Sequence, residues 1–197
     1  DLITQDLNSS SVALRVPLLE VVSRRLGPAA NPLLFREANN PSPAVANAAL
    51  RALGRTARPG EVPALLSILA ESYHTDIFGE VENAAAQALE RIQLPAERSK
   101  LVRHALDRAQ TTEGRCSLLD LLPRCGDAAA LTVLESNAAS TDARIPVTLL
   151  RALAEWPDAR AWKALAEAYR ESTKEPLRSV ALRGLMRLAI ELNAHST

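Results

Sequence analysis

One short pattern returns six times along the chain, and it restricts the fold more than any other feature. Its aliphatic anchors are spaced 31, 36, 33, 31 and 32 residues apart, at Val22, Leu53, Leu89, Leu122, Leu153 and Leu185. A small or aliphatic partner precedes each anchor by three or four residues: Leu19, Leu50, Ala85 with Ala86, Leu119, Leu150 and Leu182. A period of about 30–47 residues is typical of stacked helical hairpins, each too small to bury its own apolar face. We therefore expect an all-α fold, a right-handed α–α superhelix of five to six helical hairpins, as a single solenoid domain over residues 1–197.

The spacing of apolar residues and the positions of Pro and Gly predict the helices. They fall near 11–26, 45–53, 62–69, 78–93, 96–109, 111–125, 127–138, 142–155, 158–171 and 175–193. No β-branched run alternates with period two, so we expect no strands. Pro17 and Pro123 lie inside two of these ranges, and each should kink its helix or mark a local break.

The residues around the second anchor carry a family resemblance. The run Ser42-Pro43-Ala44-Val45, followed by Ala48-Ala49-Leu50-Arg51-Ala52-Leu53-Gly54, resembles a HEAT repeat of the short bacterial, phycobilisome-lyase-like type, an armadillo-like helical repeat. Residues 115–126, 145–156 and 177–188 share the likeness, and the first repeat shares it more weakly. The resemblance implies a protein-binding or scaffolding repeat fold. In the family a Val-Arg pair opens the inner helix, but Ala46, Glu82 and Pro146 stand at the Arg position in three repeats here.

Composition narrows the function classes. The 23 basic residues balance the 23 acidic ones, whereas a non-specific nucleic-acid binder normally carries a basic excess. Aromatic residues make up only 3% of the chain, which leaves little for stacking on bases. No apolar run is long enough for a membrane span. We therefore expect neither a nucleic-acid partner nor a membrane-spanning segment.

Catalytic and metal-binding patterns are missing from the sequence. The three His residues, at 74, 104 and 195, share no helix face and stand next to no Glu, unlike the iron-binding His-Glu pairs of deoxyhypusine hydroxylases, which are built on a similar fold. With only Cys116 and Cys125 beside them, they do not supply a zinc ligand set. The two cysteines lie nine residues apart on one predicted helix, about 13 Å along its axis, which is too far for a disulfide. We expect a protein that is not an enzyme and that holds no cofactor and no metal.

An arginine recurs two residues after five of the six anchors. These residues are Arg24, Arg55, Arg91, Arg124 and Arg187, and Glu155 takes the place in the fifth repeat. Stacked repeats would bring them into one row near the ends of the inner helices. Two interpretations stay open: the row binds an anionic ligand, or it is structural, because Arg near a helix C-terminus can cap carbonyl groups and meets the negative end of the dipole.

The longest repeat contains an insertion, and insertions in solenoids map to loops on one face, often the binding face. Tyr73, His74 and Phe78 lie in it and are candidate contact residues, although Ile77 or Phe78 could instead pack back as a hydrophobic staple. Trp156 and Trp162 flank a turn farther along, where we expect core packing.

These observations favour a non-catalytic protein-binding or scaffolding domain. By analogy of fold alone, the alternatives are an accessory lyase or chaperone that handles a cofactor, and a nucleic-acid-binding repeat protein. The only Met is Met186, so we expect a piece excised from a longer protein, with neighbouring domains of that chain as candidate partners. Because the apolar arc of the last helix is wide, we also expect self-association through it. The sequence contains no signal that assigns a cellular compartment.

Overall fold

A computed structural model describes residues 11–71, 75–138 and 140–194. Every regular element in these ranges is helical and none is a strand, so the predicted all-α fold is confirmed. The chain divides into two compact units, residues 1–93 and residues 94–197. The expectation of one continuous domain over residues 1–197 stays a prediction.

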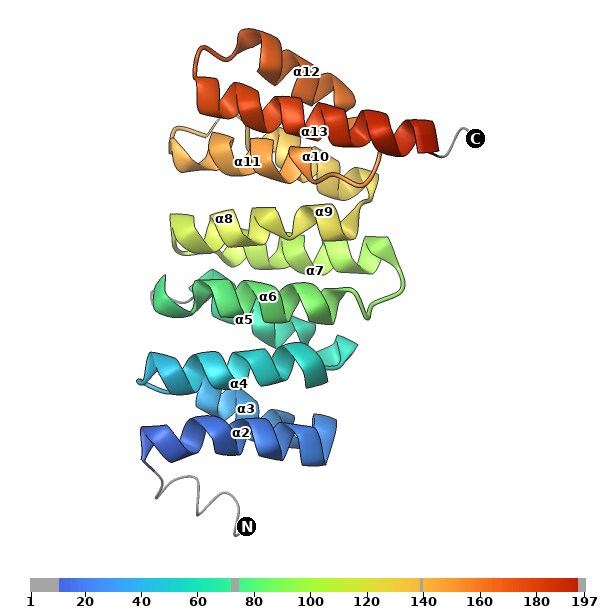
Figure 1. Cartoon of the computed structure of the whole chain (residues 1–197). Helices are drawn as coiled ribbons and strands as arrows, with labels where there is room; N and C mark the ends of the chain where they lie inside the picture. Colours follow the sequence, from blue (N-terminus) through green and yellow to red (C-terminus); the bar gives the residue numbers. More distant parts are fainter. Residues whose placement is uncertain (1–10, 72–74, 139, 195–197) are drawn as a thin grey trace. The chain divides into compact units, whose positions relative to one another are not determined.

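The first unit contains α2 (Val12–Leu26), α3 (Asn31–Ala38), α4 (Pro43–Thr56), α5 (Val62–Glu71) and α6 (Phe78–Leu89), with short 3₁₀ helices at Gly27–Ala30, Pro59–Glu61 and Thr75–Ile77. The pattern helices α2, α4 and α6 lie side by side, and α3 and α5 lie behind them (Figure 1). Helix α4 packs against both α2 and α6, while α3 packs on α4 and α5 packs on α6. The helices that carry the repeated pattern therefore stack directly on one another.

The second unit repeats this arrangement. It contains α7 (Pro95–Arg108), α8 (Thr112–Asp120), α9 (Leu122–Cys125), α10 (Ala128–Ser136), α11 (Arg144–Ala154), α12 (Trp162–Glu171) and α13 (Glu175–Ala194), with a 3₁₀ turn at Ala159–Ala161. Helix α11 packs against both α8 and α13, as α4 does between its neighbours, and α12 packs on α13.

The repeated aliphatic positions form the core of both units. The anchors Val22, Leu53, Leu89 and Leu122 are buried, while Leu153 and Leu185 are half-buried. Their partner positions are buried at Leu19, Leu50, Ala85, Leu119 and Leu150. A spacing of three or four residues places anchor and partner on one helix face, which is why one short pattern can supply a continuous apolar strip.

Proline and glycine set several helix boundaries. Helix α8 ends at Asp120 and α9 begins at Leu122, so the break expected at Pro123 is present, whereas α2 runs without interruption through Pro17. Gly126 ends α9 with a φ of 68°, a left-handed conformation that favours glycine. The carboxylate of the next residue, Asp127, accepts a hydrogen bond of 2.9 Å from the Ala130 amide and so caps α10.

The two cysteines are unpaired thiols in this structure, as expected. Burial raises the pKa of the Cys125 thiol to about 12, so it stays protonated at neutral pH. Within the ranges that the structure describes, no helix is long and apolar enough to cross a membrane.

Candidate binding surfaces

The first unit brings three of the predicted arginines to the same ends of neighbouring helices. Arg24 lies in the last turn of α2, Arg55 lies in the last turn of α4, and Arg91 follows the end of α6. The row forms because α4 packs between α2 and α6 and because the repeat places each arginine at an equivalent position.

Arg91 is tied to the end of the preceding pattern helix. Its guanidinium donates hydrogen bonds to the carbonyl oxygens of Gly54 (2.8 Å), Arg55 (3.2 Å) and Ala57 (3.3 Å). The carbonyls in the last turn of a helix have no partner within the helix, so these bonds satisfy acceptors that would otherwise need water. The cation also lies at the negative end of the α4 dipole.

Arg24 and Arg55 have different surroundings. Arg24 forms an exposed ion pair of 2.8 Å with Glu20, one turn earlier on α2. Arg55 is exposed, and among the described residues its guanidinium has no hydrogen-bonding or ionic partner.

Two further arginines lie on this edge that the repeat pattern did not identify. Arg25 is in the last turn of α2, and Arg58 directly precedes the turn at Pro59–Glu61. Both are exposed, and neither guanidinium is paired within the described ranges. Their signals in the sequence are a doubled arginine at a helix end and an Arg before a Pro-Gly turn. We call Arg24, Arg25, Arg55, Arg58 and Arg91 the basic edge of the first unit.

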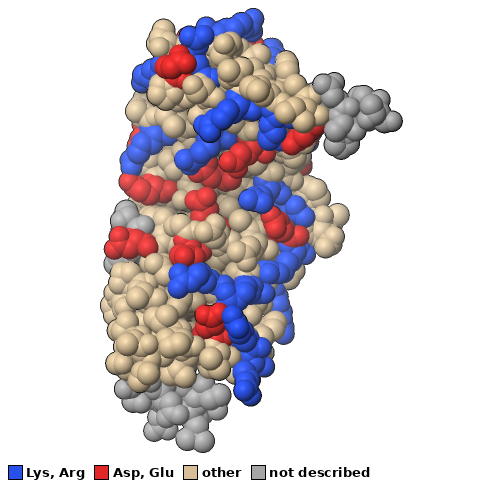
Figure 2. Space-filling view, in the orientation of Figure 1, with Lys and Arg blue, Asp and Glu red and all other residues tan. Residues whose placement is uncertain are grey.

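Figure 2 shows this edge as a band of basic side chains, drawn in blue, along one side of the first unit. The carboxylates on the same edge are Glu20, Glu61 and Glu90. Glu20 pairs with Arg24, and Glu61 accepts 2.7 Å hydrogen bonds from the Asn31 amide and from the backbone N–H of Arg58. Five cations against three carboxylates leave the edge with a positive excess.

In the second unit, Arg187 caps a helix end in the same way as Arg91. It donates a 3.0 Å hydrogen bond to the Ala154 carbonyl at the end of α11 and another to the Trp156 carbonyl, and it pairs with Glu191 at 2.8 Å. Because α13 continues to Ala194, Arg187 lies well inside this helix rather than near its end. Arg124 is exposed at the end of α9, and its own carbonyl accepts a 2.9 Å hydrogen bond from Arg98.

The insertion of the longest repeat is described only in part. Tyr73 and His74 lie outside the described residues. Phe78 is the first residue of α6 and is half-buried, while Ile77 is 7% exposed and belongs to the core. The Asn47 side chain donates a 3.2 Å hydrogen bond to the carbonyl of Asp76 and so ties this segment to α4.

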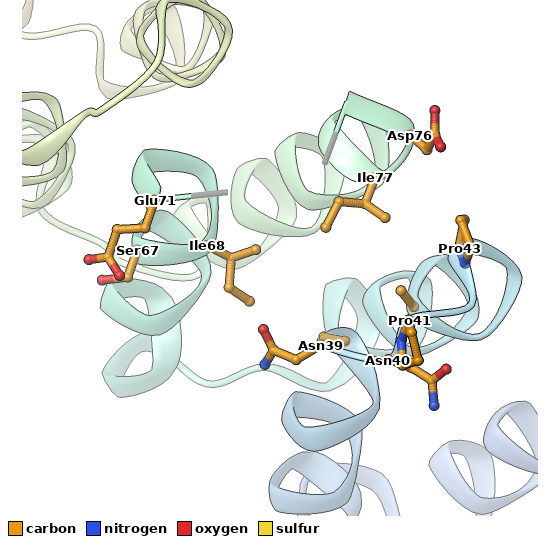
Figure 3. Close-up of a pocket in the computed structure, with 11 residues that line it drawn as sticks. Asn39, Asn40, Pro41, Pro43, Ser67, Ile68, Glu71, Asp76 and Ile77 are labelled. Atoms are coloured by element: carbon orange, nitrogen blue, oxygen red, sulfur yellow. The ribbon is translucent and has the colours of Figure 1, made fainter. Parts of the chain in front are cut away.

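A pocket of about 550 Å³ lies in the first unit, between the α3–α4 turn, α5 and the 3₁₀ turn that precedes α6 (Figure 3). Asn39, Ile68 and Ile77 point toward one another across it. The amide of Asn40 donates to Glu37 (3.0 Å) and its oxygen accepts from the Ser42 N–H (3.0 Å), so this side chain holds the α3–α4 turn. These contacts are those of a structural turn rather than of a reactive group.

A second candidate surface is an apolar stripe on α13. Leu182, Met186 and Ile190, spaced by one helical turn, are 42%, 57% and 67% exposed. Leu182 stands at the position where four of the other five repeats have a buried leucine, namely Leu19, Leu50, Leu119 and Leu150. The sequence indicated a wide apolar arc on this helix, and the structure shows which side of the arc is left open. We call these three residues the α13 stripe.

The described part of the chain contains no group of three or more His, Cys, Asp or Glu side chains close enough to hold a metal ion. The basic edge and the α13 stripe are both suited to non-covalent contact, the first with anionic groups and the second with apolar ones.

The chain is similar to a known protein family over part of its length. Residues 1–90 match the family of HEAT repeats. No curated protein matches the chain.

Proposed function

The chain is a HEAT-repeat protein, with repeats recognised over residues 1–90, and from this premise we propose that it is a non-catalytic, protein-binding scaffold domain. HEAT repeats generally mediate protein–protein interaction or scaffolding. The observation that carries the proposal is the α13 stripe, because an apolar face at a normally covered repeat position fits protein contact.

The repeat register supports this use of the stripe. In the first unit, Leu50 of α4 is fully buried, and α4 packs against α6. Leu182 occupies the same repeat position as Leu50, yet it is 42% exposed. Covering apolar surface contributes roughly 25 cal/mol for each Å² removed from water, so a helix that packs on the stripe would form a favourable contact.

The partner we propose for the stripe is a second copy of this chain. The surfaces that cover equivalent leucines within the chain are helices of its own repeats, and a second copy presents helices of the same kind. The stripe on α13 can also pair with itself, since a two-fold interface places the same patch on both partners. Neighbouring domains of a longer chain are the other partners compatible with this surface.

Light scattering over a range of concentrations tests the proposal. The wild-type chain should form dimers as concentration rises, and Leu182→Glu and Ile190→Glu should each keep it monomeric, because a charge buried at an apolar contact is costly. Val147→Glu is the matched control, since Val147 is 45% exposed on α11, outside the stripe. A wild-type chain that stays monomeric at high concentration would overturn self-association, as would equal effects of all three changes.

Among the described residues, no contact or cavity favours cofactor handling or nucleic-acid binding over protein binding.

A further inference from the structure

We infer that the basic edge of the first unit is a docking site for an acidic segment of a partner protein. This inference names the chemistry of one partner and rests on the proposed protein-binding function. It concerns a different surface from the α13 stripe, so the experiment on the basic edge and the experiment on the stripe can fail independently.

Charge is segregated along the helices of the first unit. Five of its eight arginines lie at the ends of α2, α4 and α6 that form the basic edge. The opposite end of the unit carries five acidic residues, Glu37, Glu71, Asp76, Glu80 and Glu82, together with the remaining three arginines, of which Arg15 and Arg36 pair with Glu37 and Arg51 pairs with Glu80. The arginines at that end are therefore already paired with carboxylates, whereas the basic edge carries an excess of cations that an anionic ligand can contact.

The end of α4 is the centre of the basic edge. The Arg91 guanidinium lies within hydrogen-bonding distance of the carbonyls of Gly54, Arg55 and Ala57, so its charge lies against the segment that contains Arg55 and directly precedes Arg58. Arginines from two helices thus meet at one place. Arg91 is held by three backbone acceptors, which fixes part of the site before any ligand arrives.

Arg55 and Arg58 are the open cations of this cluster. Both are exposed, and their guanidinium groups make no ion pair or hydrogen bond with another described residue. A guanidinium presents a planar set of donors that matches a carboxylate in a bidentate arrangement. The nearest carboxylate in the sequence, Glu61, already accepts from Asn31 and from the Arg58 backbone. Arg25, on the end of α2, adds a third open cation.

An acidic protein segment fits this surface better than a nucleic acid. Residues 1–93 contain 8 Arg, no Lys and 10 Asp or Glu, a net charge of −2, so a long polyanion would meet the acidic end of the unit as well. A short segment with a few Glu or Asp residues can contact the basic edge alone. Leu26, 46% exposed beside Arg25, offers an apolar contact that such a segment can also use.

Fluorescence anisotropy with a labelled Glu-rich peptide tests this site, with the same peptide carrying Gln for Glu as the neutral probe. The wild-type chain should bind the Glu peptide and not the Gln peptide, and binding should weaken between about 50 mM and about 200 mM salt, since exposed ion pairs are screened. The double variant Arg55→Ala, Arg58→Ala should bind about tenfold more weakly or worse, because two charge-assisted contacts are lost.

The matched control is Lys100→Ala with Arg103→Ala, which removes two exposed cations of the same spacing from α7. It should leave binding unchanged. The single variant Arg25→Ala tests the site independently if the double variant loses its helical circular dichroism signal. The inference is overturned if the wild-type chain does not bind the Glu peptide, or if the control variant of Lys100 and Arg103 loses as much binding as the double variant of Arg55 and Arg58. Tighter binding of duplex DNA, lost in the same double variant, would assign the edge to nucleic acid. None of these outcomes alters the test of the α13 stripe.

Discussion

Arg91 and Gly54, which are 37 residues apart in the sequence, join α6 to α4 by a hydrogen bond. The guanidinium of Arg91, at the end of α6, donates a 2.8 Å hydrogen bond to the carbonyl of Gly54 in the last turn of α4. Arg187 makes the equivalent contact with Ala154 in the second unit, at 3.0 Å. In both cases the arginine of one repeat caps the pattern helix of the repeat before it.

Arg91→Ala should destabilise the fold by about 1–2 kcal/mol, because it leaves carbonyl groups at a helix end without their donor. Arg24→Ala is the matched comparison, since Arg24 is 73% exposed and makes only a surface ion pair, and it should cost less than about 0.5 kcal/mol. Urea denaturation of both variants measures the difference. Equal stability of the two would show that the cap contributes nothing beyond a surface charge.

Gly184→Ala should loosen the packing of α13 on α11. A Cβ added at Gly184 would lie 2.8 Å from the Cα of Ala154 and 2.9 Å from its Cβ, closer than real contacts allow, so the helices must shift. We expect a loss of about 1–3 kcal/mol from overpacking. Gly79→Ala, where nothing lies within 4 Å, should instead stabilise α6 by about 0.5–1 kcal/mol through helix propensity. Thermal denaturation followed by circular dichroism distinguishes the two signs, and a tolerated Gly184→Ala contradicts the packing described for α13.

The two tryptophans should respond very differently to truncation. Trp156 is fully buried, so Trp156→Ala should cost about 3–5 kcal/mol. Trp162 is 41% exposed at the start of α12, and Trp162→Ala should cost less than about 1 kcal/mol. Denaturant titrations give both values. A similar large loss for each would place Trp162 in the core, against its exposure.

The ion pair of Asp142 with Arg144 and its hydrogen bond with Thr112 of α8 should make the second unit sensitive to acid. Hydrogen bonds from the Arg144 side chain and backbone and from the Thr112 hydroxyl hold the pKa of Asp142 well below its ordinary value of 3.8. A carboxyl group whose pKa is lowered by folding adds stability above its ordinary pKa and loses it as pH falls below about 4. Burial raises the pKa of Asp120, so this group has the opposite effect on how stability changes with pH. Asp120 is unchanged in the variant Asp142→Asn, so its effect cancels when the variant is compared with the wild-type chain.

Asp142→Asn should therefore lower the urea midpoint at about pH 6 and should make the fall between about pH 4 and about pH 2 shallower than in the wild-type chain. The wild-type and variant curves should converge at the acidic end. Parallel curves over this range would show that Asp142 contributes no linkage.

Much of the local structure was predictable from the sequence, because its causes are local. The ranges expected near 11–26, 62–69, 96–109 and 175–193 correspond to α2, α5, α7 and α13. Helix α3 had no predicted range, since its eight residues are too few for a clear apolar period. The predicted helix over 111–125 is divided at Leu121, two residues before Pro123, the proline expected to kink or break it.

The candidate site was predictable only in outline. The repeat pattern placed Arg24, Arg55 and Arg91 at equivalent helix positions, and the structure brings them to one edge of the first unit. It did not identify Arg25 and Arg58, because neither recurs with the period. Nor did it distinguish Trp156 from Trp162, since both flank the same turn and only the packing of neighbouring helices decides which ring is covered.

The sequence by itself determined the helical repeat and its core positions, because side-chain spacing along a helix fixes which residues share a face. The tertiary structure alone decided what those positions do. Arg55 and Arg91 stand at the same place in the repeat, yet Arg91 reaches the carbonyls of a neighbouring helix end while the Arg55 guanidinium remains exposed. Leu50 and Leu182 likewise share one position, but Leu50 is buried and Leu182 is 42% exposed. The physical reason is that capping and burial depend on which helix lies alongside, a property of packing that no single repeat encodes.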